Sequence, residues 1–215
     1  QEGLDIHLHR GFGNMIINLF PVSIYIDKNA SIVINGMNLF NAWTKQPEQY
    51  YESNFVTTLS DYSNLGTGTA YDLISTRDGK ILTEFIKQST INYLKENMQK
   101  TNYDVIVNNL WLNEMTSGSA HLKHNHSGYT LSGTFYVEVP EPSNKIEFYN
   151  LVDDIGLQKV LDAEEWTPSN SANWWIPVES GTIVIFPAYL KHSVPKEEFK
   201  GSRKSIAFDI TLKEK

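Results

Sequence analysis

The sequence predicts a mainly β domain with flanking helices, closed into a single barrel or jelly roll. Three observations indicate this fold. After about residue 100, hydrophobic and polar residues alternate with a period of two, which is typical of half-buried strands. Turn-forming segments such as "TSGS", "PEPSN" and "KEEFKGS" separate these runs. A strongly helical segment precedes them, and helices followed by many short strands favour a β barrel covered by helices on one side.

The strongest helical pattern covers residues 79–99, where apolar residues recur at helical spacing, and we expect this helix to cover a sheet. Its apolar positions are Leu82, Phe85, Ile86, Tyr93, Leu94 and Met98. Residues 15–26 are expected to form a strand with a break at Pro21. Residues 29–43 suit either a strand or a short helix. The later strands are expected over residues 103–115, 130–139, 144–150, 181–187 and 203–212.

Two longer segments have no clear period. Residues 45–72 contain the loop signal "LGTGT", and residues 152–180 contain "WTPSNSANWW". A long insertion in a β domain is often a lid or a substrate-binding loop. For residues 152–180, an ordinary surface excursion with two buried tryptophans fits equally well.

The composition predicts one domain. The chain has 215 residues, of which 40% are hydrophobic, and this is enough for one sizeable core. Residues 1–14 precede Met15 and are expected to be a remnant of expression. Residues 15–215 are then one domain, with helical support over about residues 15–100 and the barrel over about residues 103–212.

Charge and residue content exclude several classes of protein. The net charge of −7 without a basic run argues against nucleic-acid binding, which needs clustered Lys and Arg. No apolar run reaches the roughly 18 residues that a membrane helix needs. Because cysteine is absent, a metal site must use His, Asp or Glu, and a cytoplasmic location is expected, in the host cytoplasm if the chain is viral. Oligomeric state is not predicted.

Outside residues 1–14, the histidines fall in two places. His121, His124 and His126 lie within six positions, and His192 follows much later. On a regular strand, residues two apart share a face, so His124 and His126 are expected to point together. His121 is then expected on the opposite face, outside the set of metal ligands. By itself, H-x-H is more often a solvated polar pair.

His192 and a later arginine make the histidine pair more specific. His192 ends "GTIVIFPAYLKH" (181–192), where an apolar strand and a turn could bring it to the first pair as a facial triad on iron. Arg203 begins the last strand and shares one face with Ser205 and Ala207. Arginine binds both oxygens of a carboxylate, although a surface arginine at a strand end is the commoner interpretation.

Together these motifs resemble the iron(II)- and 2-oxoglutarate-dependent oxygenases of the prolyl-hydroxylase-like kind. The matching segments are "HNH" at 124–126, "SGTFYVEVP" at 132–140, "GTIVIFPAYLKH" at 181–192 and "GSRKSIAF" at 201–208. They are also similar to a group of such oxygenases from marine bacteria and phages. The resemblance implies a double-stranded β-helix, that is, a jelly-roll or cupin-like barrel.

The resemblance also implies roles for single residues. His124 and His192 would bind Fe(II), with His126 at the position where the family usually has Asp or Glu. The cosubstrate 2-oxoglutarate would bind through its distal carboxylate to Arg203, Tyr136 and Ser205. No catalytic residue beyond the metal ligands is expected. The implied reaction uses O2 to couple decarboxylation of 2-oxoglutarate to hydroxylation of an unidentified small-molecule or peptide substrate.

The third histidine leaves alternatives open. An all-histidine shell keeps the charge of iron at +2, as in cupin-type dioxygenases, which resemble this fold and need no 2-oxoglutarate. An acid recruited from elsewhere in the chain is a further possibility, and so is a ligand-binding jelly roll that is not an enzyme. A structural jelly roll is the weakest alternative, because it does not explain the spacing of His192 and Arg203. The alignment of Arg203 with Tyr136 favours the 2-oxoglutarate oxygenase.

Overall fold

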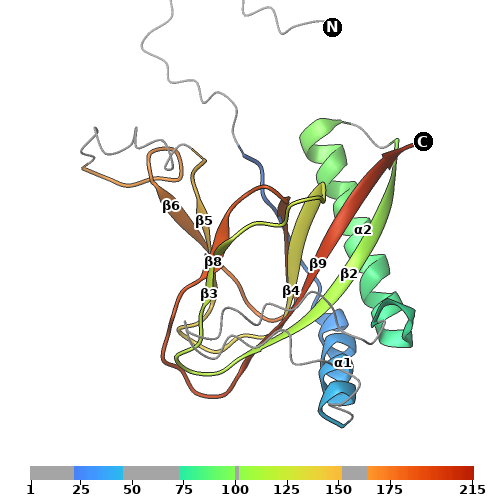
Figure 1. The fold of residues 1–215 in the computed structure, drawn as a ribbon, viewed down its shortest axis with the longest axis horizontal. Coiled ribbons are helices and arrows are strands. Elements are labelled where there is room, and N and C mark those ends of the chain that lie inside the picture. Colours follow the sequence, from blue (N-terminus) through green and yellow to red (C-terminus); the bar gives the residue numbers. More distant parts are fainter. Residues whose placement is uncertain (1–21, 46–72, 100–101, 152–163) are drawn as a thin grey trace, which may run out of the picture.

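Two antiparallel sheets face one another, and two helices cover the outer face of the larger sheet (Figure 1). The computed structural model describes residues 22–45, 73–99, 102–151 and 164–215. Within these residues, no helix is long and apolar enough to cross a membrane.

The larger sheet has five strands, and the smaller sheet has four. In spatial order, the larger sheet contains β1 (Tyr25–Lys28), β7 (Thr182–Pro187), β4 (Leu131–Glu138), β9 (Arg203–Glu214) and β2 (Tyr103–Met115). The smaller sheet contains β3 (His121–His124), β8 (His192–Val194), β5 (Lys145–Tyr149) and β6 (Asn173–Pro177). This mainly β architecture with two packed sheets confirms the predicted double-stranded β-helix.

The helices are α1 (Val33–Lys45) and α2 (Arg77–Met98), each preceded by a short 3-10 turn, η1 (Ala30–Ile32) and η4 (Leu73–Ser75). The side chain of Thr76 caps α2 by accepting a hydrogen bond of 2.9 Å from the backbone N–H of Gly79. The apolar face of α2 packs on the larger sheet as predicted, except that Met98 at the helix end is 54% exposed.

A glycine allows α1 to lie close to the sheet. A Cβ atom added at Gly36 would come within 2.6 Å of Val137 Cγ2 on β4. Real Cβ atoms do not approach so closely, so a larger residue would push α1 outward. Between the helices and the sheet lies the main hydrophobic core, to which β9 contributes Ile206, Phe208 and Ile210.

The structure also corrects and completes the predicted elements. The segment 29–43 is helical over most of its length, as α1. The strand expected over residues 15–26 is present only from Tyr25 in the described residues, and residues 15–21 lie outside them. The loop expected over residues 45–72 lies almost entirely outside the described residues, and the division of the chain into domains stays a prediction.

The segment 152–180 is less irregular than expected. Its end forms β6, a strand at the edge of the smaller sheet that pairs with β5. Trp174 and Trp175 on this strand are 37% and 55% exposed, so the interpretation with two buried tryptophans is wrong. No described element packs beyond this edge strand, which explains why the rings are not buried. The part of a lid that would fall on residues 152–163 lies outside the described residues.

Candidate active site

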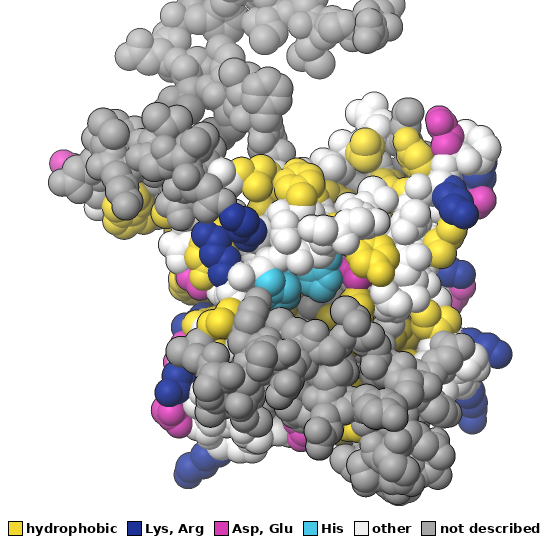
Figure 2. Space-filling view, in the orientation of Figure 1, with side chains coloured by type: hydrophobic (Ala, Val, Ile, Leu, Met, Phe, Trp, Pro, Cys, Tyr) yellow, Lys and Arg dark blue, Asp and Glu magenta, His cyan; other side chains and the backbone are white. Residues whose placement is uncertain are grey.

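The cavity between the sheets is built by alternation along β9. Arg203, Ser205, Ala207 and Asp209 point into it, whereas the residues between them enter the main core. This confirms the predicted face of the last strand. The cavity has a volume of about 490 Å³ and is lined by residues of both sheets. Figure 2 shows histidine side chains at the surface of a hollow, so the cavity opens to solvent there.

Polar residues of neighbouring strands continue the row on β9 across the cavity floor. Ser205 lies opposite Asn113 of β2 and Tyr136 of β4. Asp209 lies opposite Asn109 of β2 and Ser132 of β4. All of these residues line the cavity. A buried floor of this polarity is unusual for a hydrophobic core and indicates a binding site.

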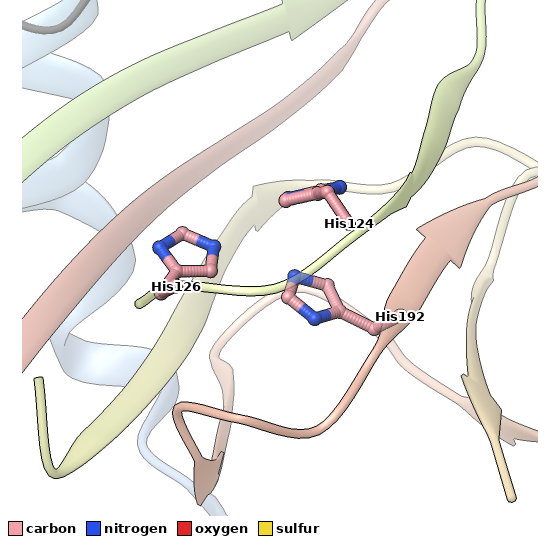
Figure 3. Close-up of side chains that lie close together, drawn as sticks. All are labelled: His124, His126 and His192. Atoms are coloured by element: carbon pink, nitrogen blue, oxygen red, sulfur yellow. The ribbon is translucent and has the colours of Figure 1, made fainter. Parts of the chain in front are cut away.

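The three predicted metal ligands converge at the open end of the cavity (Figure 3). His124 and His192 are register partners on β3 and β8, and their ring centroids are 4.4 Å apart. His126 follows the end of β3, where its backbone N–H donates to the carbonyl of Ala188 at 2.9 Å. One ring nitrogen of each histidine lies within 4.8 Å of those of the other two.

The local geometry differs from the predicted H-x-H on a regular strand. β3 ends at His124, so His126 reaches the site from the following loop. The register of β3 against β8 is irregular between His121 and His124. His121 therefore lines the same cavity, and the expectation that it points to the opposite face is wrong. Its Nε2 atom is buried and has no hydrogen-bond partner among the described residues.

A backbone oxygen orients two of the three converging rings. Nδ1 of His124 lies 2.6 Å from the carbonyl oxygen of Leu122, and Nδ1 of His192 lies 3.1 Å from that of Leu190. Because a carbonyl only accepts hydrogen bonds, each Nδ1 must carry the proton. Nε2 then has the free lone pair that a metal requires.

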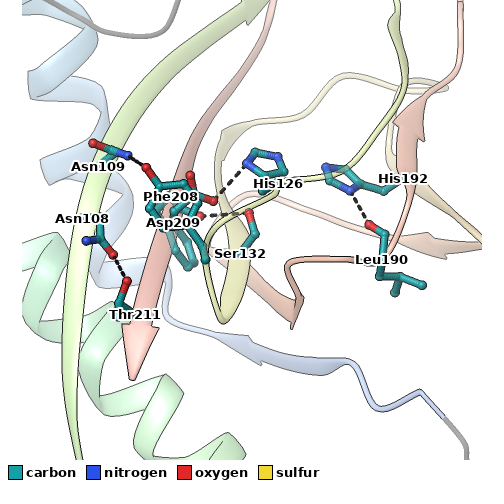
Figure 4. Close-up of polar contacts among 10 residues, drawn as sticks. Asn108, Asn109, His126, Ser132, Leu190, His192, Phe208, Asp209 and Thr211 are labelled. Atoms are coloured by element: carbon teal, nitrogen blue, oxygen red, sulfur yellow. Dashed lines mark hydrogen bonds and ion pairs between the residues drawn. The ribbon is translucent and has the colours of Figure 1, made fainter. Parts of the chain in front are cut away.

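The third ring lies beside a carboxylate. Nδ1 of His126 lies 2.9 Å from Oδ1 of Asp209, which is 1% exposed (Figure 4). Asp209 is not among the site residues expected from the sequence, although extending the alternation of Arg203, Ser205 and Ala207 by one step places it on the cavity face. The alternative of an acid recruited from elsewhere in the chain thus has a candidate, whose Oδ1 lies 2.9 Å from a ring nitrogen of His126.

Burial keeps several of these rings neutral. Loss of solvent lowers the pKa of His124, and it lowers the pKa of His192 well below its usual value. It also lowers the pKa of His121 to about 3. Neutral imidazoles are the form that binds metal. Three converging histidines with oriented Nε2 atoms therefore fit a divalent transition metal such as Fe(II).

At the other end of the cavity lies Arg203, which is 1% exposed, so the interpretation as a surface arginine is wrong. Its Nε donates to the carbonyl of Ser143 at 3.1 Å and its Nη2 to that of Lys145 at 3.5 Å. Within the described residues, no Asp or Glu oxygen lies within 4.0 Å of the guanidinium. A buried cation without an anion is costly, so this geometry calls for an anionic ligand.

Tyr136 and Ser205 lie beside this arginine. The guanidinium carbon of Arg203 is 5.1 Å from the centre of the Tyr136 ring. The Tyr136 hydroxyl is buried and has no hydrogen-bond partner among the described residues. Burial raises the pKa of Tyr136, so the hydroxyl remains a donor. The structure thus brings together the three residues predicted for the cosubstrate, and their donors could bind one carboxylate.

Comparison with known proteins agrees with this arrangement. A family model described as "Putative 2OG-Fe(II) oxygenase" matches residues 109–209, which include both the histidines and Arg203. Over residues 109–209 the chain thus matches the 2OG-Fe(II) oxygenases, a family of oxidoreductases, as the sequence motifs implied. No curated protein matches the chain. Membership of the group from marine bacteria and phages stays a prediction.

Solved structures of other proteins share the fold of this chain. AviO1 from Streptomyces viridochromogenes is 9% identical with a TM-score of 0.55, and the match covers 88% of this chain and 90% of AviO1. A prolyl hydroxylase from Trichoplax adhaerens, in complex with a peptide fragment, is 12% identical with a TM-score of 0.55 over 87% and 83% of the two chains. HygX from Streptomyces hygroscopicus, with nickel and 2-oxoglutarate bound, is 10% identical with a TM-score of 0.51 over 88% and 82%.

Proposed function

We propose that His124, His126 and His192 hold Fe(II) in this oxygenase, each through its Nε2 atom. The arrangement of the three rings supports this assignment. Their ring nitrogens converge within 4.8 Å, and an oxygen lies at hydrogen-bonding distance from Nδ1 of each ring. Such oxygens fix the tautomer and the orientation of metal-binding imidazoles.

The cosubstrate 2-oxoglutarate would bind at the other end of the same cavity through its distal carboxylate. The observation that carries this proposal is the buried guanidinium of Arg203, which has no acidic partner in the described residues. A carboxylate supplies the missing charge and matches the forked donors of arginine. The hydroxyls of Tyr136 and Ser205 would donate to the same group. The 2-oxoglutarate bound to HygX supports this choice of ligand.

Bound Fe(II) would supply the chemistry by which O2 and 2-oxoglutarate yield succinate and CO2 while one oxygen atom enters a C–H bond of the substrate. The protein would contribute by holding the reactants close together in a cavity of limited solvent access. The substrate would reach the histidines from the open end, where Trp111 and Tyr129 line the cavity. A small molecule or a peptide fits this proposal, and the peptide in the complex of the Trichoplax prolyl hydroxylase supports the second class.

The test needs no knowledge of the substrate. Purified protein is incubated with Fe(II), O2, ascorbate and 2-oxoglutarate, and succinate is measured over time. We expect slow succinate formation in the wild type and its loss in the matched variants His124→Ala and Arg203→Met. A wild type that binds Fe(II) but forms no succinate with any candidate substrate would instead indicate a three-histidine dioxygenase without 2-oxoglutarate. Formation of succinate that survives Arg203→Met unchanged would contradict the assigned cosubstrate site.

A further inference from the structure

Asp209 is a buried carboxylate, and in the described residues His126 is the one basic side chain within 4.0 Å of it. Its neighbours across the strands direct their donors elsewhere: Asn109 donates to the Tyr129 hydroxyl at 2.9 Å, and Ser132 donates to a backbone carbonyl at 3.1 Å (Figure 4). In the described part of the chain, no Lys or Arg nitrogen lies within 4.0 Å of Asp209. A carboxylate with 1% exposure is too costly to keep without a specific role.

The contact to Asp209 differs from those that orient the other two rings. His124 and His192 are oriented by neutral carbonyls two residues earlier in the chain, so the local backbone determines their orientation. Nδ1 of His126 instead lies 2.9 Å from a carboxylate oxygen of β9, more than 80 residues later in the chain. Because the segment after His124 is a loop, the backbone alone leaves the ring of His126 free to rotate. An external acceptor is needed to direct its Nε2 into the site.

We propose that Asp209 is a positioning residue for metal binding that acts through His126. Its carboxylate accepts the Nδ1–H of His126, which fixes the tautomer and directs Nε2 towards the other two histidines. It also places one negative charge a single imidazole away from the metal. Three neutral imidazoles leave the charge of a divalent ion uncompensated in a partly buried site, and Asp209 reduces that net charge from +2 to +1. This inference rests on the proposed metal site.

Metal affinity tests the role directly and without turnover. The dissociation constants of Co(II) and, without oxygen, of Fe(II) are measured by equilibrium dialysis for the wild type, Asp209→Asn, Asp209→Ala and His126→Ala. Asp209→Asn keeps the size and an acceptor oxygen but loses the charge, and Asp209→Ala loses both. We expect binding to weaken by about 10- to 100-fold in Asp209→Asn and by more in Asp209→Ala. Asp27→Asn, the same substitution at a carboxylate of β1 that does not line the cavity, is the matched control and should bind metal like the wild type.

Unfolding of the metal-free proteins separates positioning from simple packing. Asp209→Asn should be at least as stable as the wild type without metal, because it removes a buried charge. If metal-free stability falls while metal affinity is unchanged, Asp209 has a packing role and the proposal is wrong. If His126→Ala binds like the wild type and Asp209→Asn does not bind, Asp209 is itself the ligand, which also overturns it. A wild type without metal affinity would reject the proposed function as well as this inference.

Discussion

The two faces of β9 both carry fully buried side chains, but these have opposite chemistry. One face places Ile206, Phe208 and Ile210 in the main core, and each is 0% exposed. The other presents three polar residues to the cavity at only 1–2% exposure, namely Arg203, Ser205 and Asp209. Burial therefore does not distinguish the residues that stabilise the fold from those that form the site. The distinguishing feature is whether a buried side chain is apolar and packs in the core, or is polar and lines the cavity.

The largest expected effect is on the apolar face. Phe208→Ala should lower the free energy of unfolding by about 3–5 kcal/mol, since it leaves a cavity where the ring packs closely over Gly133. A Cβ atom added at Gly133 would lie 2.4 Å from the Phe208 ring, so this ring packs directly against the backbone of Gly133. Urea denaturation of the metal-free protein measures the change. Ser205→Ala, on the opposite face, is the control and should change stability by less than about 1 kcal/mol.

The second prediction concerns the charged residue of the cavity face. Arg203→Met should weaken 2-oxoglutarate binding by about 2–3 kcal/mol, roughly 30- to 150-fold, because it removes charge-assisted hydrogen bonds. Stability without ligand should change by less than about 1 kcal/mol, since the lost hydrogen bonds to two carbonyls are offset by removing a buried unpaired cation. Calorimetric titration with 2-oxoglutarate and urea denaturation check both parts. A large loss of stability with unchanged affinity would mean that Arg203 belongs to the scaffold.

The contrast between the faces of β9 is predictable from sequence because strand alternation is local. The period of two in "RKSIAFDI" is enough to separate Arg203 and Ser205 from the core residues. The same local rule fails at His121, where an irregular register in β3 turns the ring into the cavity. Neither a short strand nor its irregularity leaves a clear trace in a sequence, because both depend on the pairing partner, here β8.

Asp209 shows a different limit of prediction from sequence. Its position on the cavity face follows from alternation, but its partner His126 comes from a loop more than 80 residues earlier. Only the pairing of β9 with β4, and the hydrogen bond from His126 to Ala188, bring the two side chains within 2.9 Å. Contacts of this kind between remote segments depend on the tertiary structure. Local sequence patterns therefore do not predict them.

The third prediction tests whether buried polar groups of the cavity reduce stability. The pKa of His121 is lowered to about 3 by burial, from 6.5 in the unfolded chain. Between these values the unfolded state binds the additional proton, so stability falls as the pH drops through 6.5. Each histidine with such a lowered pKa contributes about 1.4 kcal/mol per pH unit to the decrease in the free energy of unfolding. In the metal-free protein, His121→Gln should therefore show a shallower loss of stability between pH 6 and pH 4.5 than the wild type.

The pH series has a clear opposing outcome. Urea midpoints are measured at half-unit steps for both proteins, without metal. His124 and His192 also have lowered pKa values, so some loss towards acid remains in the variant. Parallel curves for the wild type and His121→Gln would mean that His121 is protonated to the same extent in the folded and unfolded states. The ring would then be more accessible to water than its position in the cavity indicates.

The smallest expected effect comes from replacing Ser205, and it tests whether the two ends of the cavity bind their ligands independently. Ser205 is a register partner of Tyr136, and its hydroxyl lines the cavity near Arg203. Ser205→Ala removes one neutral donor and should weaken 2-oxoglutarate binding by about 1 kcal/mol, roughly fivefold. Metal affinity should not change, because Ser205 lies two rungs of the sheet away from Asp209. An equal loss of cosubstrate and metal affinity would show that the two ends of the cavity are coupled, and the separation of roles along β9 would then be wrong.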